Sequence, residues 1–359
     1  MPSLEEKYKG VPKKVAAVLA AYETEFFRED KPAPFCGMQV YPIAVRDYEK
    51  FMDATACLSF DKNTAAAGLS MTNFEYLYSK MMSKEPMAQG SETTVGQLWS
   101  YRFYEVLKLC LHLDNGMICP KCGHITPYGS EEFQKLKQKF DAKVVALFVA
   151  NPEALKSEEV KRKLVTEHAE LQHLYCPYCH HDETKNEKGE IIPATDSALI
   201  PRITYQKDSK NKLQMTVDGK YVVSSKDFDL FKYMVMFQNI SDYRDESWID
   251  PSLRKDHEES MKIRQKQNPV SASLERKVVA LSMISNYKIS EIYDMPIRKF
   301  SMALSLGDDL IEYKINKLAA MVGLVQLPKG KKIEHWLYKE DKELYGNSYK
   351  TLDDFKAVS

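Results

Sequence analysis

The fold of this 359-residue chain is organised around two stretches that share one pattern, Met117-Ile-Cys-Pro-Lys-Cys-Gly-His124 and Leu174-Tyr-Cys-Pro-Tyr-Cys-His-His181. Each stretch carries a Cys-x-x-Cys turn, called a knuckle below, whose two sulfurs can point toward one tetrahedral ion. Four thiolates favour zinc and leave no coordination position for water. We therefore predict one structural Zn²⁺ per chain, bound by Cys119, Cys122, Cys176 and Cys179.

Other uses of the cysteine pairs stay open at this point. A redox dithiol normally opens a helix within a βαβ unit, and neither pair is followed by a helix-like run. A disulfide framework is typical of secreted proteins, whereas this chain shows no signal peptide and has only seven cysteines. Iron is the alternative metal for four thiolates. The doubled spacing favours structural zinc, and such a site rarely performs chemistry.

The two knuckles are unusually far apart in the sequence. The 53 residues from 123 to 175 exceed the roughly 15–20 of an ordinary zinc ribbon, so residues 117–181 are predicted to form a split zinc-ribbon module with a helical insert. The flanking histidines are alternative ligands, although a closed tetrahedral site needs no fifth one: His124, His180 and His181. The cysteines without a Cys-x-x-Cys partner are expected as small buried hydrophobic side chains in a reducing compartment: Cys36, Cys57 and Cys110.

Composition narrows the class of protein. Hydrophobic residues make up 44% of the chain, which is enough for ordinary folded cores, and the length predicts two or three domains. The 51 basic and 51 acidic side chains cancel, which argues against a protein that mainly coats nucleic acid. No run of eighteen apolar residues occurs, so no membrane span is expected.

Apolar periodicity then divides the chain into four segments around the knuckles. Residues 1–116 are predicted as an N-terminal helical domain, in which Thr72 and Glu75 mark a capping box. Its elements are helices at residues 11–28, 47–60, 73–82 and 95–113, and an edge strand at 38–45. The insert of the zinc module is predicted to contain helices at 130–140 and 157–174 and a buried strand at 143–150. Both knuckles would thus follow helices, and the metal would clamp two helix ends together.

The second half is predicted as a β-hairpin plus helices over residues 182–270 and a C-terminal helical bundle with a tail over 271–359. Val217-Asp218-Gly219-Lys220 is a type I′ hairpin signal, and Ser225 is the expected cap of a helix at 227–239 that faces the core. The other predicted elements are strands at 202–206, 213–217 and 221–223, a charged helix at 251–267, and short helices at 273–284, from 290, from 296 and at 308–322. The fold class is therefore α+β and mainly helical, a helical body with the split four-cysteine knuckle pair, a small antiparallel sheet and a C-terminal bundle.

Few residues suggest chemistry beyond the metal. No nucleophile elbow, P-loop, His-Glu-x-x-His helix or dinucleotide-binding glycine pattern occurs, so no catalytic residue or small-molecule substrate is assigned. Residues 289–300 have the rhythm of a helix-turn-helix, in which Arg298 and Lys299 would face a DNA groove. No basic excess surrounds them, because Asp308, Asp309 and Glu312 follow closely. Nucleic-acid contact is therefore the less favoured interpretation.

Several short runs, most of them with spaced aromatic residues, occur in both halves of the chain. In the first half they are Val40-Tyr-Pro-Ile-Ala-Val-Arg-Asp-Tyr48-Glu-Lys-Phe51, Leu58-Ser-Phe-Asp-Lys-Asn63 and Leu69-Ser-Met-Thr-Asn-Phe-Glu-Tyr-Leu77. In the second half they are Asp227-Phe228, Gln238-Asn239, Ser273-Leu-Glu275, residues 289–300 and Glu334-His335-Trp336-Leu337. Together these runs give the chain a resemblance to proteins encoded in the tail modules of large tailed phages of low-GC bacteria. It covers about half of the chain, contains no diagnostic motif and assigns no catalytic residue. It implies a tail, baseplate or assembly protein, with the knuckles as an insertion between the resembling halves.

Three functions follow as expectations. The first is a structural or assembly component of a phage tail or baseplate, a zinc-stabilised scaffold that binds other tail proteins or itself. Such a protein is located in the virion after synthesis in the host cytoplasm. The second is a nucleic-acid-binding regulator that uses the zinc ribbon and the C-terminal helices. The third is a metal-dependent or thiol enzyme, which requires an open metal position or a low-pKa cysteine.

Overall fold

The computed structural model describes residues 7–8, 10–60, 70–88, 90–152, 159–160, 173–179, 184–185, 191–192, 198–241, 243, 245 and 272–322. Contacts between residues divide the chain into two compact units. The first comprises Met1–Glu23, Pro42–Glu49 and Met236–Ser359, and the second Thr24–Tyr41 and Lys50–Val235. Both units combine segments that are distant in sequence. The division into four consecutive segments stays a prediction from periodicity, which carries no information on which segments pack together.

The second unit is built on two helices that begin with capping boxes. They are α4 (Asn73–Met81) and α5 (Val95–Leu111). As predicted, the Thr72 hydroxyl accepts a hydrogen bond from the Glu75 amide at 3.1 Å, and the Glu75 carboxylate accepts one from the Thr72 amide at 2.8 Å. Thr94 and Gln97 form the same pair at the start of α5. Helix α5 stops two residues before the predicted end, because His112 takes a left-handed conformation at φ 53°.

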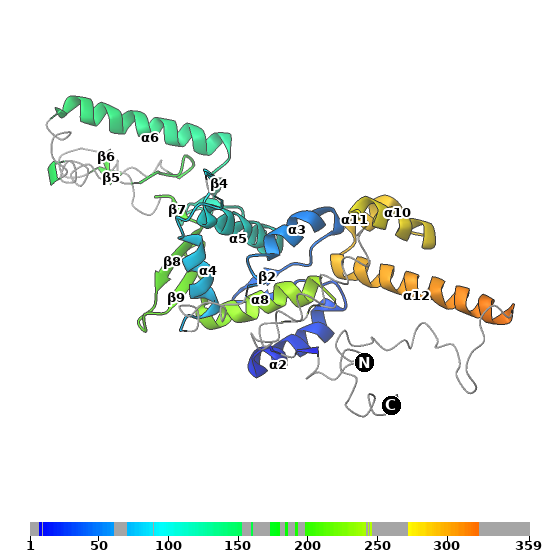
Figure 1. Ribbon diagram of the computed structural model, residues 1–359. Coiled ribbons are helices and arrows are strands. Elements are labelled where there is room, and N and C mark those ends of the chain that lie inside the picture. The colour runs from blue at the N-terminus through cyan, green and yellow to red at the C-terminus, as the bar shows by residue number, and fades with distance from the viewer. Residues whose placement is uncertain are drawn as a thin grey trace. The chain divides into compact units, whose positions relative to one another are not determined.

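A three-stranded antiparallel sheet packs against α4 in the same unit (Figure 1). Its strands are β8 (Ile203–Lys207), β9 (Leu213–Val217) and β10 (Tyr221–Ser224), in the order β10-β9-β8. Asp218 and Gly219 have φ of 52° and 65°, which confirms the predicted type I′ turn. The aromatic rings of Phe74 and Tyr78 on α4 contact the ring of Tyr205 on β8.

Helix α8 (Ser225–Asn239) follows the sheet, starts in the second unit and ends in the first. Its aromatic and methionine side chains are at most 3% exposed, as predicted for a core helix: Phe228, Phe231, Tyr233, Met234 and Phe237. The predicted cap at Ser225 is wrong by one residue. The Ser224 hydroxyl accepts from the Asp227 amide and the Asp227 carboxylate accepts from the Ser224 amide, whereas the Ser225 hydroxyl donates to the Leu213 carbonyl.

Shorter elements occupy the first sixty residues. They are α2 (Lys13–Tyr22), the π-helical turn η1 (Glu23–Phe27), the hairpin β1 (Ala33–Phe35) and β2 (Met38–Val40), the 3-10 turn η2 (Val45–Asp47), and α3 (Tyr48–Thr55). The predicted edge strand at 38–45 ends at Val40, because Pro42 follows and has no amide to donate to a strand partner. The expected helix at 47–60 is also shorter than its apolar pattern.

The first unit contains α10 (Leu274–Ile284), α11 (Ile289–Asp294) and α12 (Ile297–Met321). The predicted separate helices from 296 and from 308 are wrong, since they form the single helix α12. Gly307 lies inside it, where an added Cβ would be 2.3 Å from the Ile284 Cδ1 atom of α10. The glycine therefore permits close helix packing and does not end the helix. The cluster around Phe300 and Ile292 also includes Val45 of η2, so the C-terminal helices share a core with a segment near the N-terminus.

The remaining elements surround the knuckles and belong to the second unit. They are β3 (Gly116–Ile118), β4 (Ile125–Pro127), α6 (Glu131–Ala150), the short pair β5 (Thr184–Lys185) and β6 (Ile191–Ile192), and β7 (Ile200–Pro201). The strand predicted at 143–150 is wrong, because these residues continue α6, where Val145 and Val149 are 60% and 75% exposed. The observed fold confirms the α+β, mainly helical class. Among the residues that the structure describes, no helix has both the length and the apolar character needed to cross a membrane. The charged helix expected at 251–267 lies outside those residues.

Candidate metal centre

The first knuckle is the tight end of the β3–β4 hairpin. The Cys119 amide donates to the His124 carbonyl at 2.9 Å, and the Gly123 amide donates to the Cys119 carbonyl at 2.9 Å. Gly123 has φ +74°, a conformation that glycine adopts without steric cost. The knuckle thus follows a strand. The expectation that helices lead directly into both knuckles is wrong here, since α5 ends at Leu111 and β3 comes between.

The second knuckle joins the same sheet through the strand that follows it. Tyr175 forms an isolated β-bridge with Ala198, and the Leu199 amide donates to the Leu174 carbonyl at 2.7 Å. Strand β7 then pairs antiparallel with β3, which gives the strand order β4-β3-β7. This pairing brings together two knuckles that are far apart in the sequence. Most of the helix predicted at 157–174 lies outside the described residues.

The four predicted ligands meet. The sulfurs of Cys119, Cys122, Cys176 and Cys179 all lie within 4.8 Å of one another, and Cys122 Sγ is 3.7 Å from Cys176 Sγ. Zn–S bonds of about 2.3 Å in a tetrahedron would separate the sulfurs by roughly 3.8 Å. The group can therefore hold a metal ion. All four are free thiols, so none of them is joined in a disulfide.

Burial of the tetrad is uneven. Cys119 and Cys176 are fully buried and pack with Leu199, whereas Cys179 is half-buried and Cys122 is exposed. Leu136 of α6 and Leu174 lie against this small cluster. One side of the site is thus enclosed by apolar side chains, and the other faces the surface.

The sulfurs share protons with one another. Hydrogen bonds, first from Cys179 and then from the His124 amide, lower the pKa of Cys122 to about 7. The hydrogen bond to Cys122, together with burial, raises the pKa of Cys179 to about 12. Burial is also the main reason that the pKa of Cys176 is raised. Cys122 is therefore the most acidic of these three thiols, and a metal that binds Cys176 and Cys179 must displace their protons.

His124, an alternative ligand, has other partners. Its Nε2 atom lies 3.1 Å and 3.2 Å from the two carboxylate oxygens of Glu132 on α6. Its ring contacts the ring of Tyr178 in the second knuckle, with 4.4 Å between centroids. His180 and His181 lie outside the described residues. No sequence pattern singles out Glu132 or Tyr178 as part of the site, although Ser130 followed by two glutamates is a recognisable helix start.

The cysteines outside the tetrad differ in burial. Cys57 and Cys110 are buried as predicted, whereas Cys36 is half-buried in the turn between β1 and β2. Burial raises the pKa of Cys57 to about 12 and that of Cys36 to about 11. Both thiols are therefore protonated at neutral pH and make poor nucleophiles.

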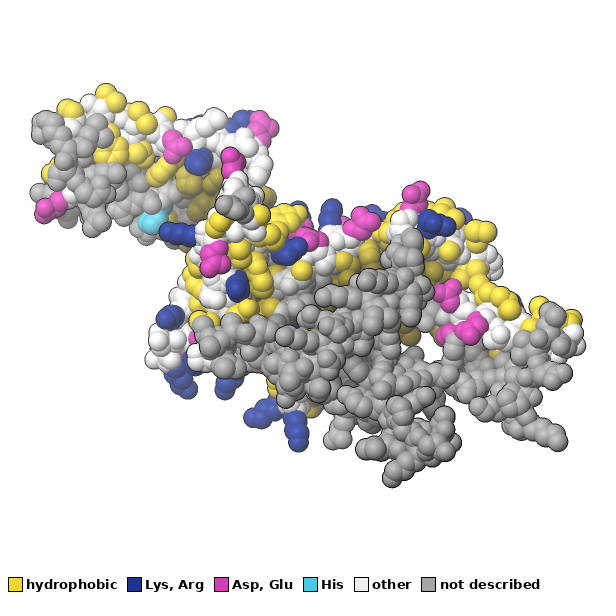
Figure 2. Space-filling model, viewed as in Figure 1, with side chains coloured by type: hydrophobic (Ala, Val, Ile, Leu, Met, Phe, Trp, Pro, Cys, Tyr) yellow, Lys and Arg dark blue, Asp and Glu magenta, His cyan; other side chains and the backbone are white. Residues whose placement is uncertain are grey.

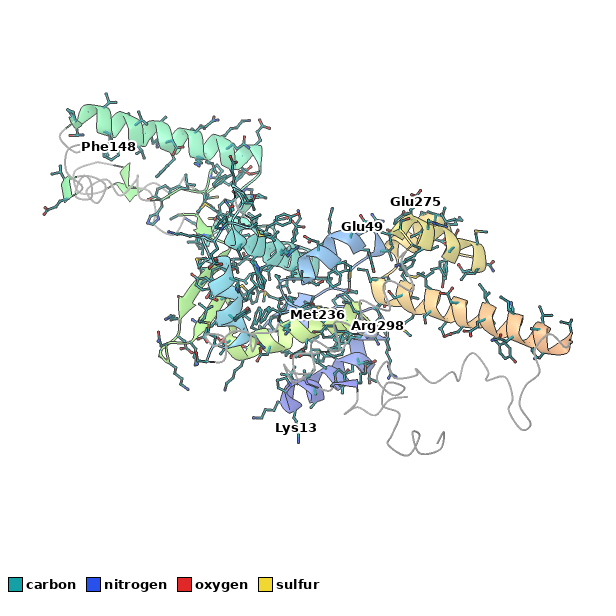
Figure 3. The ribbon with its side chains drawn as sticks, in the orientation of Figure 1. Lys13, Glu49, Phe148, Met236, Glu275 and Arg298 are labelled. Carbon is teal, nitrogen blue, oxygen red and sulfur yellow. The ribbon has the colours of Figure 1, made fainter. Side chains whose placement is uncertain are left out.

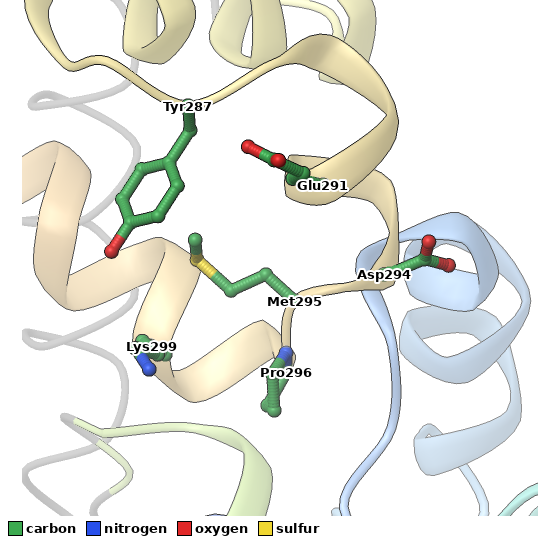
Figure 4. Close-up of a pocket in the computed structure, with 6 residues that line it drawn as sticks. All are labelled: Tyr287, Glu291, Asp294, Met295, Pro296 and Lys299. Atoms are coloured by element: carbon green, nitrogen blue, oxygen red, sulfur yellow. The ribbon is translucent and has the colours of Figure 1, made fainter.

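The expectation that Arg298 faces a DNA groove, as in a helix-turn-helix, is wrong. Arg298 is only 7% exposed and lies at the first turn of α12 (Figure 3). Its Nη2 atom donates to the Glu23 carboxylate at 2.9 Å and its Nη1 atom to the Phe237 carbonyl at 2.7 Å. Lys299 is exposed and lines an open pocket of about 430 Å³ that also includes Glu291 and Asp294 (Figure 4). This pocket carries charges of both signs.

Comparison with known proteins finds no match, whether the chain is compared with family models, with curated proteins or with solved structures.

Proposed function

We propose that the protein is a zinc-stabilised scaffold for protein–protein contacts, and that it serves as a structural or assembly component of a phage tail or baseplate. The observation that carries the scaffold is the meeting of four cysteine sulfurs within 4.8 Å. Four thiolates complete a tetrahedral zinc site, so the ion holds structure and offers no position to a substrate. The likeness of the spaced aromatic runs to phage tail-module proteins supports the location.

A second observation supports docking. The apolar stripe of α12 begins at Phe300 and Leu304, which pack in the core of the C-terminal helices. The same stripe continues at helical spacing beyond Gly307, where Ile315 and Leu318 are 59% and 61% exposed. Figure 2 shows hydrophobic side chains at the surface of this region. Exposed apolar side chains in line on one helix face are typical of a contact with another protein.

The proposed partners are other tail or baseplate proteins, or a second copy of the chain. The protein would be made in the host cytoplasm and would act in the virion. Replacing Ile315 and Leu318 by aspartate should weaken these contacts without affecting the fold, because both side chains are exposed. Asn316→Asp, a neighbouring exposed change, is the matched control.

The test of the scaffold is metal content together with mass in native solution. We expect one zinc per full-length chain, and loss of the ion in Cys176→Ser but not in Cys36→Ser. A metal-free wild-type chain would overturn the zinc scaffold, and iron would change the identity of the ion. Mass spectrometry of purified particles of the encoding phage tests the location. If the protein is absent from both the particles and the assembly intermediates, its proposed place in the phage tail or baseplate is wrong.

The nucleic-acid-binding regulator is the less favoured alternative. Arg298, which the helix-turn-helix interpretation placed in a groove, is buried against Glu23. A gel shift that weakens with salt would support this alternative, because contacts with phosphates release counterions.

A further inference from the structure

The two knuckles contact each other through side chains that are not metal ligands. His124 follows Cys122 by two positions, and Tyr178 lies between Cys176 and Cys179. Their ring centroids are 4.4 Å apart at an interplanar angle of 53°. A third residue, Glu132 in the first turn of α6, places its carboxylate 3.1 Å from His124 Nε2. Three separate segments therefore meet beside the tetrad.

The backbone of His124 is engaged with the ligands at the same time. Its carbonyl accepts a hydrogen bond from the Cys119 amide at 2.9 Å. Its own amide donates to the Cys122 sulfur. The imidazole thus extends from a residue whose two backbone groups already contact both cysteines of the first knuckle. Contacts that hold the imidazole therefore also restrict the backbone of this residue.

We propose that His124 is a positioning residue for the metal centre, and that His124, Tyr178 and Glu132 form a latch, as we call this trio, that joins both knuckles to α6. The proposal rests on the metal-binding part of the proposed function. Closing the long segment between the knuckles costs chain entropy. Contacts made before the ion binds reduce the part of that cost that falls on metal binding. Groups that orient the ligands of a metal site typically affect metal affinity by about 10–100-fold.

The latch also shapes the surface beside the site. Leu136 and Lys139 of α6 line a pocket of about 460 Å³ together with Pro177 and Tyr178 of the second knuckle. Tyr178 is 63% exposed, and its ring contact with His124 links it to the first knuckle. The latch therefore acts beside Leu136, which packs against the cysteines, in holding α6 next to the second knuckle.

The experiment measures the zinc dissociation constant of the full chain by competition with a chromogenic chelator, and the visible spectrum of its Co²⁺ form. His124→Ala and Tyr178→Ala should each weaken zinc binding by about 10-fold or more, and should shift the Co²⁺ ligand-field bands as the sulfur angles relax. Tyr178→Phe should keep wild-type values, because the ring contact needs no hydroxyl. Glu131→Gln is the control variant on α6 and should keep wild-type zinc affinity, since Glu131 pairs with the exposed Lys135.

The double variant His124→Ala/Tyr178→Ala separates a latch from two independent effects. If the residues act together, the double variant loses no more affinity than the worse single variant. Wild-type affinity and spectrum in both single variants would overturn the latch, as would losses that multiply in the double variant. A wild-type chain that binds no metal would instead overturn the proposed function. Circular dichroism of each variant identifies misfolding. If His124→Ala misfolds, the test of the latch is the zinc affinity of Tyr178→Ala compared with that of Tyr178→Phe.

Discussion

Removing the metal should open the knuckle region while the phenylalanine core of the same unit stays folded. The cluster around the tetrad contains, besides cysteines, the buried Leu199 and the partly buried Met117, Leu136 and Leu174. Burial of a leucine-sized side chain contributes about 1.5–3 kcal/mol, so these four side chains supply roughly 6–12 kcal/mol at most. Ordering the backbone of eight knuckle residues costs about 8–16 kcal/mol at 1–2 kcal/mol each. Apolar burial alone therefore does not hold the knuckles, whereas structural zinc contributes on the order of 10 kcal/mol.

The assay is hydrogen exchange read by mass spectrometry, with and without a strong chelator. Peptides that cover residues 116–127 and 198–202 should lose protection by about 1000-fold or more, which corresponds to roughly 4 kcal/mol. Peptides from α5 and α8 should keep theirs, because Phe103 and Phe228 are fully buried in ring contact with each other and do not belong to the cluster around the tetrad. Full protection of the 116–127 peptides in protein shown to be metal-free would refute the reasoning.

Three further predictions test the packing inside each of the two units. Gly96→Ala should lower the free energy of unfolding by about 1–3 kcal/mol, because the added Cβ would lie 2.3 Å from the Ser83 carbonyl oxygen. Urea titrations measure this loss against the control Gly129→Ala, whose added Cβ has open space around it. Equal unfolding midpoints for the two variants would contradict the close packing at Gly96. Arg298→Met should lower the free energy of unfolding by about 2–3 kcal/mol, since the buried Phe237 carbonyl loses the Arg298 donor while Glu23 keeps its contact with Lys7. Arg276→Met, a change at an exposed arginine, is the control. A loss of stability no larger than that of the control would contradict the role of the buried Arg298–Glu23 pair. Burial opposes ionisation of Glu23, but hydrogen bonds and charge from Lys7, with Tyr8 and Arg298, outweigh it and lower the pKa of Glu23 below 4.5. The ionised carboxylate therefore stabilises the fold above pH 4.5, and this stabilisation is lost as pH falls through the folded-state pKa. Glu23→Gln should make the free energy of unfolding less dependent on pH in this acid range, and an unchanged dependence would contradict the role of Glu23.

The sequence predicted the features that depend on a few adjacent residues. The Cys-x-x-Cys spacing, the Thr72–Glu75 capping box and the Asp218-Gly219 turn each follow from local geometry, and the structure contains all three. The knuckle pair was identifiable because metal ligation restricts residue type and spacing at once.

Errors arose where a local pattern has two tertiary solutions. The apolar run at 143–150 fits a buried strand or a helix equally well, and it continues α6. Residues 296–322 were predicted as two helices, but they form the single helix α12, in which the missing side chain of Gly307 leaves room for Ile284. Arg298 looked like a groove-facing cation, yet a carboxylate from a segment hundreds of residues earlier in the chain neutralises it.

The sequence alone therefore determined which residues can bind a metal, where most helices and turns begin, and the fold class, because each of these depends on short-range spacing and chain geometry. Only the tertiary structure decided that β7 pairs with β3 to bring the knuckles together, that His124 lies between Glu132 and Tyr178, and that each unit combines segments distant in sequence. These arrangements depend on long-range pairing and on burial, and a single sequence read along its length does not encode them in any local pattern.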